Sequence, residues 1–144
     1  MKSEPAAFSI DDLKRVKVGG WDGVRNYSAR NFMRQMRPGD KALFYHSSIT
    51  PAAIVGLMEI VKAAYPDPTQ FDAKGDHYDP GSKADNPRWS QVDVKFERIF
   101  KKPLTLGEIK GMPALKDMML LARGRLSVQP VSPAEFEAIL KRCA

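Results

Sequence analysis

Residues 90–100 read SQVDVKFERIF, and their side chains alternate between apolar and polar. Val92, Val94 and Phe96 stand at every second position, with charged residues between them. In a β-strand, successive side chains point to opposite faces, so this period of two puts the apolar set on one face. The stretch therefore predicts a half-buried strand.

Three further segments extend the predicted sheet. Residues 41–46 (KALFYH) and 52–61 (AAIVGLMEIV) read as strands, and residues 125–130 (RLSVQP) read as a short one. Residues 65–89, by contrast, contain four prolines and show no regular period. A stretch of this length and composition predicts a long loop, and such loops are often functional lids.

Helix signals lie between and after the strands. Ser9, Thr105 and Ser132 each precede an acidic residue by three positions, which is the pattern of a capping box. Residues 28–36 (SARNFMRQM) carry an apolar face, and another helical stretch starts at Pro113. The elements together predict an α+β domain in which a curved antiparallel or mixed sheet carries peripheral helices.

The charge of the chain is positive and unevenly distributed. Its 144 residues carry a net charge of +6 with a pI of about 9.5, a balance that favours polyanionic partners. Residues 14–41 hold eight cations against two aspartates, whereas residues 66–87 hold five aspartates against two lysines. This polarity suits a nucleic-acid contact, and the alternative is an ordinary solvated helix face.

Several kinds of chemistry leave no signal in the sequence. Cys143 is the only cysteine, and with His46 and His77 it shows no metal-ligand spacing, so we expect no metal and no cofactor. No nucleophile-elbow or phosphate-loop motif is present. The lone cysteine, the missing secretory signal and the lack of a long apolar run predict a protein that is not secreted, in a reducing compartment, without membrane contact.

Residues 21–32 (WDGVRNYSARNF) combine aromatic, amide and cationic side chains. Trp21 offers a face for stacking, Asn26 offers a donor and an acceptor to a base edge, and Arg25 and Arg30 suit phosphate or base contacts. Each residue also has a purely structural interpretation, as a core tryptophan, a helix N-cap or a surface ion pair. The mixture favours a ligand that is flat and polar.

Seven motifs, taken in chain order, resemble those of the EVE domain family: KSEP, WDGVRNYSARNF, FYHSS, IVGLMEIV, AYPDPTQFD, WSQVDVKF and RLSVQPVS. The likeness implies a single EVE domain over residues 1–144, folded as a PUA-like curved β-barrel of about five to six strands with peripheral helices. The family is similar to the YTH domain, which reads methylated adenine in RNA. The resemblance therefore implies a non-catalytic reader of a methylated or hydroxymethylated base in DNA or RNA.

The predicted site joins these motifs. The residues predicted to contact the base are Ser3, Glu4, Trp21, Asn26, Tyr45, His46, Ser47, Trp89, Ser127 and Gln129, and those predicted to contact the nucleic-acid backbone are Lys2, Arg25, Arg30 and Arg125. Phe71 and Tyr78 belong to the long loop and are candidates to close over the base. The expected partner is modified DNA or RNA, bound by a monomer in the cytoplasm of a bacterium or the nucleus of a eukaryote.

Two other functions stay open at this point. A small hydrolase acting on nucleotides or RNA would need a general base, for which His46 is the candidate near neutral pH. A protein-interaction module would show an apolar surface patch instead. Saturable binding of modified nucleosides without turnover would favour the reader over the hydrolase.

Overall fold

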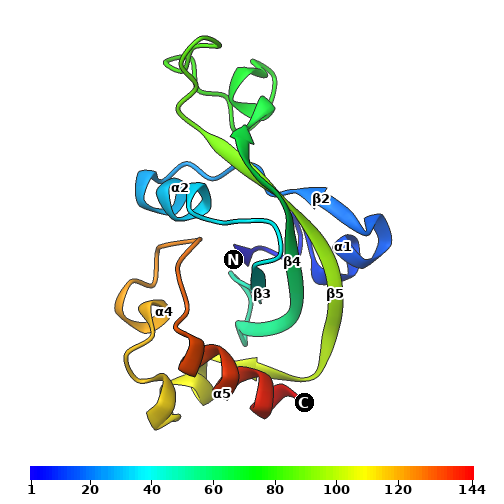
Figure 1. The fold of residues 1–144 in the computed structure, drawn as a ribbon, viewed down its shortest axis with the longest axis vertical. Coiled ribbons are helices and arrows are strands. Elements are labelled where there is room, and N and C mark those ends of the chain that lie inside the picture. Colours follow the sequence, from blue (N-terminus) through cyan, green and yellow to red (C-terminus); the bar gives the residue numbers. More distant parts are fainter.

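A curved five-stranded sheet forms the centre of the computed structural model, which describes all residues from 1 to 144 (Figure 1). The strands are β1 (Lys2–Ser3), β2 (Val18–Gly20), β3 (Lys41–His46), β4 (Ala53–Pro66) and β5 (Ser90–Thr105). Their order across the sheet is β1-β3-β4-β5-β2. The strand predicted at residues 90–100 is therefore confirmed, and it lies next to the sheet's edge strand β2.

The sheet is mixed and open. β1 pairs with β3 in parallel, while β3, β4, β5 and β2 pair antiparallel. Several register shifts interrupt the β4–β5 ladder, and such irregularities bend and twist a sheet locally. Because β1 and β2 are two separate edges, the predicted α+β class is confirmed but closure into a barrel is not.

Helices surround the sheet, and all three predicted capping boxes are confirmed. The helical elements are α1 (Ile10–Val16), α2 (Tyr27–Arg34), η1 (Pro68–Phe71), α3 (Leu106–Lys110), η2 (Pro113–Leu115), α4 (Met119–Ala122) and α5 (Pro133–Cys143). Asn26 caps α2 by accepting a hydrogen bond from the backbone N–H of Ala29 at 2.9 Å. None of these helices has the length and apolar character needed to cross a membrane.

Two predicted elements are wrong in detail. Residues 125–130 form no strand, although the carbonyl of Ser127 accepts a hydrogen bond from the backbone N–H of Lys2 at 2.8 Å. One such bond on its own does not make a ladder. The helix predicted from Pro113 is two short pieces, η2 and α4, because neither has a side-chain cap and the chain turns between them.

Two apolar clusters lie on opposite faces of the sheet, and β3 separates them. Ala42 and Phe44 belong to one cluster, together with Trp21 and buried residues of α1 and α2. Leu43 and Tyr45 belong to the other, which α3, α4 and α5 cover. Figure 1 shows these C-terminal helices at one end of the molecule and residues 67–89 at the opposite end. This alternation along β3 decides which predicted site residues lie together.

Candidate nucleic-acid interface

Five of the predicted base contacts gather where β1 ends. We call Ser3, Glu4, His46, Ser47 and Ser127 the β1-end group. Ser3 pairs with His46 across the two strands, and its carbonyl accepts a hydrogen bond from Ser47 N–H at 3.0 Å. The Glu4 carboxylate is exposed, and its only protein partner is the Ser48 hydroxyl at 3.1 Å. The group therefore presents an exposed carboxylate with one unpaired oxygen beside polar backbone and hydroxyl groups.

Trp21 is connected to this group through Phe44, whose ring also packs against His46 at 5.4 Å. It is also connected through Phe8, whose carbonyl accepts from the Ser3 hydroxyl at 2.6 Å. Its ring packs edge-on against Phe44 and Phe8, with centroid distances of 5.2 and 6.4 Å, and only 6% of the residue is exposed. The indole N–H donates to no protein atom, yet it is not among the fully buried polar atoms without a partner. One edge of the ring therefore reaches the surface while its body belongs to the core.

His46 has a structural task. Its Nε2 accepts a hydrogen bond from the backbone N–H of Ile10 at 3.1 Å, which satisfies one of the unpaired donors at the start of α1. Burial lowers the pKa of this imidazole, and the charge of Asp11 opposes that effect only in part. The lone pair that a hydrolase would need as a general base is thus already engaged.

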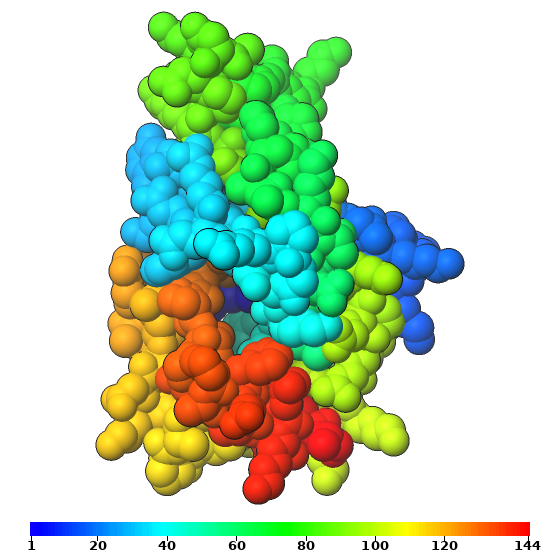
Figure 2. Space-filling view, in the orientation of Figure 1, coloured from blue at the N-terminus to red at the C-terminus, as the bar shows by residue number.

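Tyr45 and Gln129 lie on the other face, at a separate cavity of about 480 Å³. Met36, Leu120 and Phe136 contribute to its mostly apolar wall. Figure 2 shows the hollow near the middle of this face, with the N-terminus and β3 at its floor. The Gln129 amide donates to Leu126 O at 2.8 Å, and its Oε1 is the one buried side-chain polar atom without a partner. Both residues line this cavity, and Trp21 does not.

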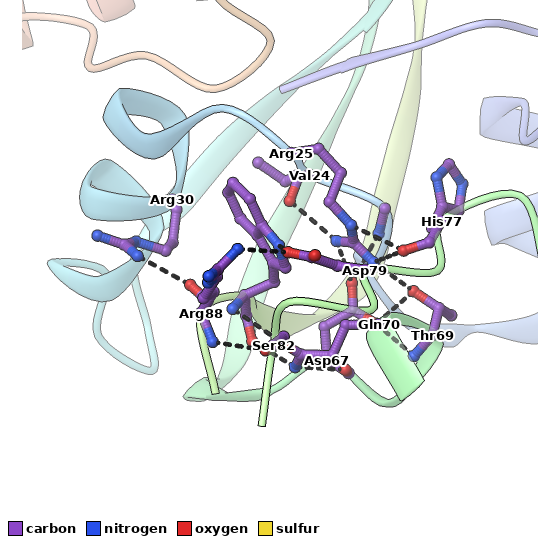
Figure 3. Close-up of polar contacts among 12 residues, drawn as sticks. Val24, Arg25, Arg30, Asp67, Thr69, Gln70, His77, Asp79, Ser82 and Arg88 are labelled. Atoms are coloured by element: carbon purple, nitrogen blue, oxygen red, sulfur yellow. Dashed lines mark hydrogen bonds and ion pairs between the residues drawn. The ribbon is translucent and has the colours of Figure 1, made fainter. Parts of the chain in front are cut away.

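Arg25 and the buried carboxylate of Asp67 join the turn after β2 to the long loop (Figure 3). All five N–H groups of Arg25 find acceptors, which are His77 O, Val24 O, the Asp67 carboxylate and Thr69 Oγ1. Burial alone would raise the pKa of Asp67, but hydrogen bonds from Thr69, Gly23 and Arg25 outweigh it and lower that pKa. Arg25 therefore fastens the loop with four of its five donors, and the fifth bonds Val24 O beside it.

The loop is built around a second buried group, Gln70. Its amide donates to Asp67 O and Trp89 O and accepts from Ser82 Oγ and Trp89 N–H, so four hydrogen bonds fix it (Figure 3). Asp79 accepts from the Trp89 indole at 2.7 Å. The predicted long loop is confirmed, but it is not unstructured, because it contains this internal network of hydrogen bonds and the short helix η1.

The remaining predicted residues lie on α2 or next to it, beside this framework. Trp89 is buried and stacks on the exposed ring of Tyr27 at 4.8 Å, and the Arg30 guanidinium lies 4.7 Å from the centre of the Tyr27 ring. Asn26 is exposed, and its amide nitrogen has no protein partner although its oxygen caps α2. We call Arg25, Asn26, Arg30 and Trp89 the α2 group, and it is distinct from the β1-end group.

The two predicted cations outside α2 lie near Ser127. Lys2 Nζ donates to Gly124 O at 2.6 Å and lies 5.7 Å from the centre of the Tyr45 ring. Burial lowers the pKa of this ammonium. Arg125 is exposed and makes no hydrogen bond or ion pair through its side chain. Positive charge thus flanks the β1-end group on the side of residues 124–127.

Sequence reasoning missed the side chains that organise the loop and its junction with α2. They are Asp67, Gln70, Asp79, Ser82, Arg34 and Arg88. Only Asp67 left a signal, since an aspartate followed by Pro68 and Thr69 is a typical helix start. Phe71 and Tyr78 are both about two-fifths exposed, and neither covers Trp21 through a ring contact. The structure has no cluster of three or more His, Cys, Asp or Glu side chains placed to share a metal ion.

Comparison with known proteins connects this geometry to a family. A family model described as the EVE domain matches residues 1–142. Human thymocyte nuclear protein 1 is 49% identical over 160 aligned residues, covering 97% of this chain and 71% of the human protein. The same protein from Danio rerio is 53% identical, with 97% and 69% covered.

Solved structures agree with the sequence comparison. A crystal structure of the human protein in complex with DNA containing 5-methylcytosine matches with a TM-score of 0.95 and 48% identity, over 99% of this chain and 94% of the other. A protein from Pseudomonas syringae matches with a TM-score of 0.96 and 46% identity, over 100% and 97%. The chain belongs to the EVE domain family.

Proposed function

We propose that this protein binds DNA that carries a modified cytosine and recognises the base without changing it. The observation that carries the proposal is the near-complete superposition on the human relative solved with 5-methylcytosine DNA, at 48% identity. Two findings on this chain support a reader rather than a hydrolase. The candidate base His46 is engaged at the start of α1, and no metal-binding cluster is present to supply a nucleophile.

We assign the base to the β1-end group. Cytosine presents an N4 amino donor, and Glu or Asp side chains typically accept hydrogen bonds from it. Glu4 is exposed, and one of its carboxylate oxygens has no protein partner. Glu4 follows Ser3 at the end of β1, and the Ser3 carbonyl bonds Ser47 N–H, so polar groups neighbour this acceptor.

Trp21 supplies the aromatic surface in this proposal. Only one edge of its ring is open, so stacking on a base would require side chains that cover the ring, such as Phe8, to move aside. Extruding a base from a duplex costs a few kcal/mol, and stacking on an aromatic ring returns roughly 1–3 kcal/mol. The remainder must come from the base edge and from phosphate contacts, which is where Glu4 and the flanking cations act.

Fluorescence anisotropy with matched duplexes tests the function. One duplex carries a single 5-methylcytosine, a second carries cytosine at the same place, and an RNA duplex of the same sequence is a third ligand. We expect the methylated DNA to bind most tightly. Equal affinity for the first two duplexes would contradict a modified-base reader. Mass spectrometry of the nucleosides after incubation checks that the base is unchanged, since a new product would support a hydrolase.

A further inference from the structure

We propose that Arg30 and Arg34 together form a binding site for a phosphate group, and that a backbone phosphate of bound DNA occupies it. The second part rests on the proposed function, whereas the first part does not. The site lies on α2 at its junction with the end of the long loop, where Figure 3 shows Arg30 donating toward Arg88.

The two guanidinium groups converge on a single backbone oxygen. Arg30 Nη1 donates to Arg88 O at 2.9 Å, and Arg34 Nη2 donates to the same oxygen at 3.3 Å. Arg34 is held further by a hydrogen bond from its Nε to Ser90 Oγ at 3.0 Å, and Arg30 by two bonds to Asn31 Oδ1. Both cations are therefore fixed in place before any ligand arrives, which reduces the entropy lost on binding.

Neither guanidinium has a carboxylate partner. Arg15, Arg25, Arg88 and Arg142 each form an ion pair with an acidic side chain, but Arg30 and Arg34 form none. No acidic residue occurs between Tyr27 and Arg34. Burial lowers the pKa of Arg30, and the nearby charge of Arg34 lowers it further. Two like charges held together without a counterion are the arrangement that an anion would relieve.

The pair also keeps unused donors. A guanidinium carries five N–H groups, and Arg25 uses all of its own within the protein. Arg30 uses three of its five and Arg34 uses two, with Nη1 of Arg34 free of any protein acceptor. Beside Arg34 lies a hollow of about 360 Å³ walled by Ala63, Tyr65, Pro66, Pro87 and Ser90. Guanidinium groups match the oxygens of phosphate closely, so a phosphate suits this place.

The competing interpretation is a mechanical clamp that only holds α2 against Arg88 and Ser90. The two interpretations differ in their need for charge, because a clamp requires the hydrogen bonds but not a net positive charge. We would replace each arginine by glutamine in the full chain, singly and together, and measure DNA affinity from 50 to 300 mM KCl. Arg37→Gln is the control, since Arg37 is exposed nearby and its side chain has no protein partner.

The proposal predicts that Arg34→Gln and Arg30→Gln each weaken binding to methylated and unmethylated duplexes equally, and that the double variant, which loses the shared phosphate contact, lowers the salt slope by about one. Thermal melts check that the variants remain folded. A salt slope equal to that of Arg37→Gln, in a folded Arg30→Gln/Arg34→Gln protein, would overturn the role in DNA binding.

Titration with inorganic pyrophosphate tests the site independently of DNA. The probe is followed through the Arg Nε–H resonances of ¹⁵N-labelled protein, and we expect saturable shifts of Arg30 and Arg34 that the double variant loses. If the wild type bound no DNA, the proposed function would fail, but these shifts would still support the site. Shifts without any change in DNA salt slope would limit the site to free phosphates, and no shifts at all would reject it.

Discussion

Glu4 is the side chain on which the choice of base depends in the proposed site. Its exposed carboxylate can accept from the N4 amino group of cytosine, and thymine offers an acceptor at the same position. We predict that Glu4→Ala weakens binding to the 5-methylcytosine duplex by roughly 1–3 kcal/mol, with little effect on a thymine duplex. Competition binding measures both. Glu137→Gln, which removes an exposed negative charge elsewhere, is the control, and an equal loss on both duplexes would contradict base reading.

In the proposed site, Trp21 has two roles: it packs in the core and it contacts the bound base. The ring is 6% exposed within the cluster that contains Phe44, so Trp21→Ala should cost about 3–5 kcal/mol of unfolding free energy. Trp21→Phe keeps most of the packing and should lose affinity for all duplexes alike, since stacking depends little on base identity. Urea melts and anisotropy on both variants separate the effects. Normal affinity in folded Trp21→Phe would place the base away from this residue.

His46 makes the stability of the fold depend on pH. Its Nε2 accepts from Ile10 N–H only when the imidazole is neutral, and burial lowers its pKa below the ordinary 6.5. As the pH falls, His46 therefore takes up a proton in the unfolded chain before it does so in the folded protein. The stabilisation is fully present above pH 6.5 and decreases as the pH drops from 6.5 toward the lower pKa of the folded state. Melting temperatures from pH 8 to 5 should show the decline, and His46→Gln, which can still accept, should reduce it. If the melting temperature of His46→Gln declined as much as that of the wild type, groups other than His46 would cause the decline.

At the scale of elements, the sequence predicted those features that depend on residues close together in the chain. The capping boxes at Ser9, Thr105 and Ser132 depend on side chains three residues apart, and all three form as predicted. Residues 125–130 have a strand pattern but no strand, because pairing depends on a neighbour that comes from far away in the chain. The same limit applies to Arg25 and Asp67, which are 42 positions apart and together shape the loop.

The long loop is the element whose stability rests most on one side chain. Gln70 is fully buried and its side chain makes four hydrogen bonds, all of which Gln70→Leu removes. The Trp89 N–H and the Ser82 hydroxyl lose their acceptor, whereas the Asp67 and Trp89 carbonyls keep backbone donors, and each buried group left unpaired costs about 1–3 kcal/mol. We predict a marked loss of stability together with faster hydrogen exchange across residues 67–89. The exposed Gln35→Leu is the matched control, and similar exchange in both variants would show that the loop does not depend on Gln70.

At the scale of the whole molecule, the sequence identified the kinds of residues in the site but not their grouping. Trp21, Tyr45 and Gln129 were predicted as one pocket, yet β3 puts Phe44 beside Trp21 on one face and Tyr45 on the other. The side on which a residue falls depends on strand register and on the bulge between Phe44 and Tyr45. Residue type alone carries no information about that register.

The net charge of +6 leads to a last prediction about binding as a whole. Lys41 is paired with Glu59 and Glu97, and Arg25 with Asp67, so the predicted basic stretch is partly neutralised within the fold. Lys2, Arg30, Arg34 and Arg125 lack carboxylate partners. Because Arg30 and Arg34 share one phosphate in our proposal, these cations make three phosphate contacts, which give a slope of about −2.7 for log affinity against log salt, so affinity should fall roughly 40-fold between 50 and 200 mM KCl. Anisotropy titrations across this range measure the slope. A flat response would mean that these basic residues do not contact the DNA backbone, whereas a slope near −8 would require more cations than these four.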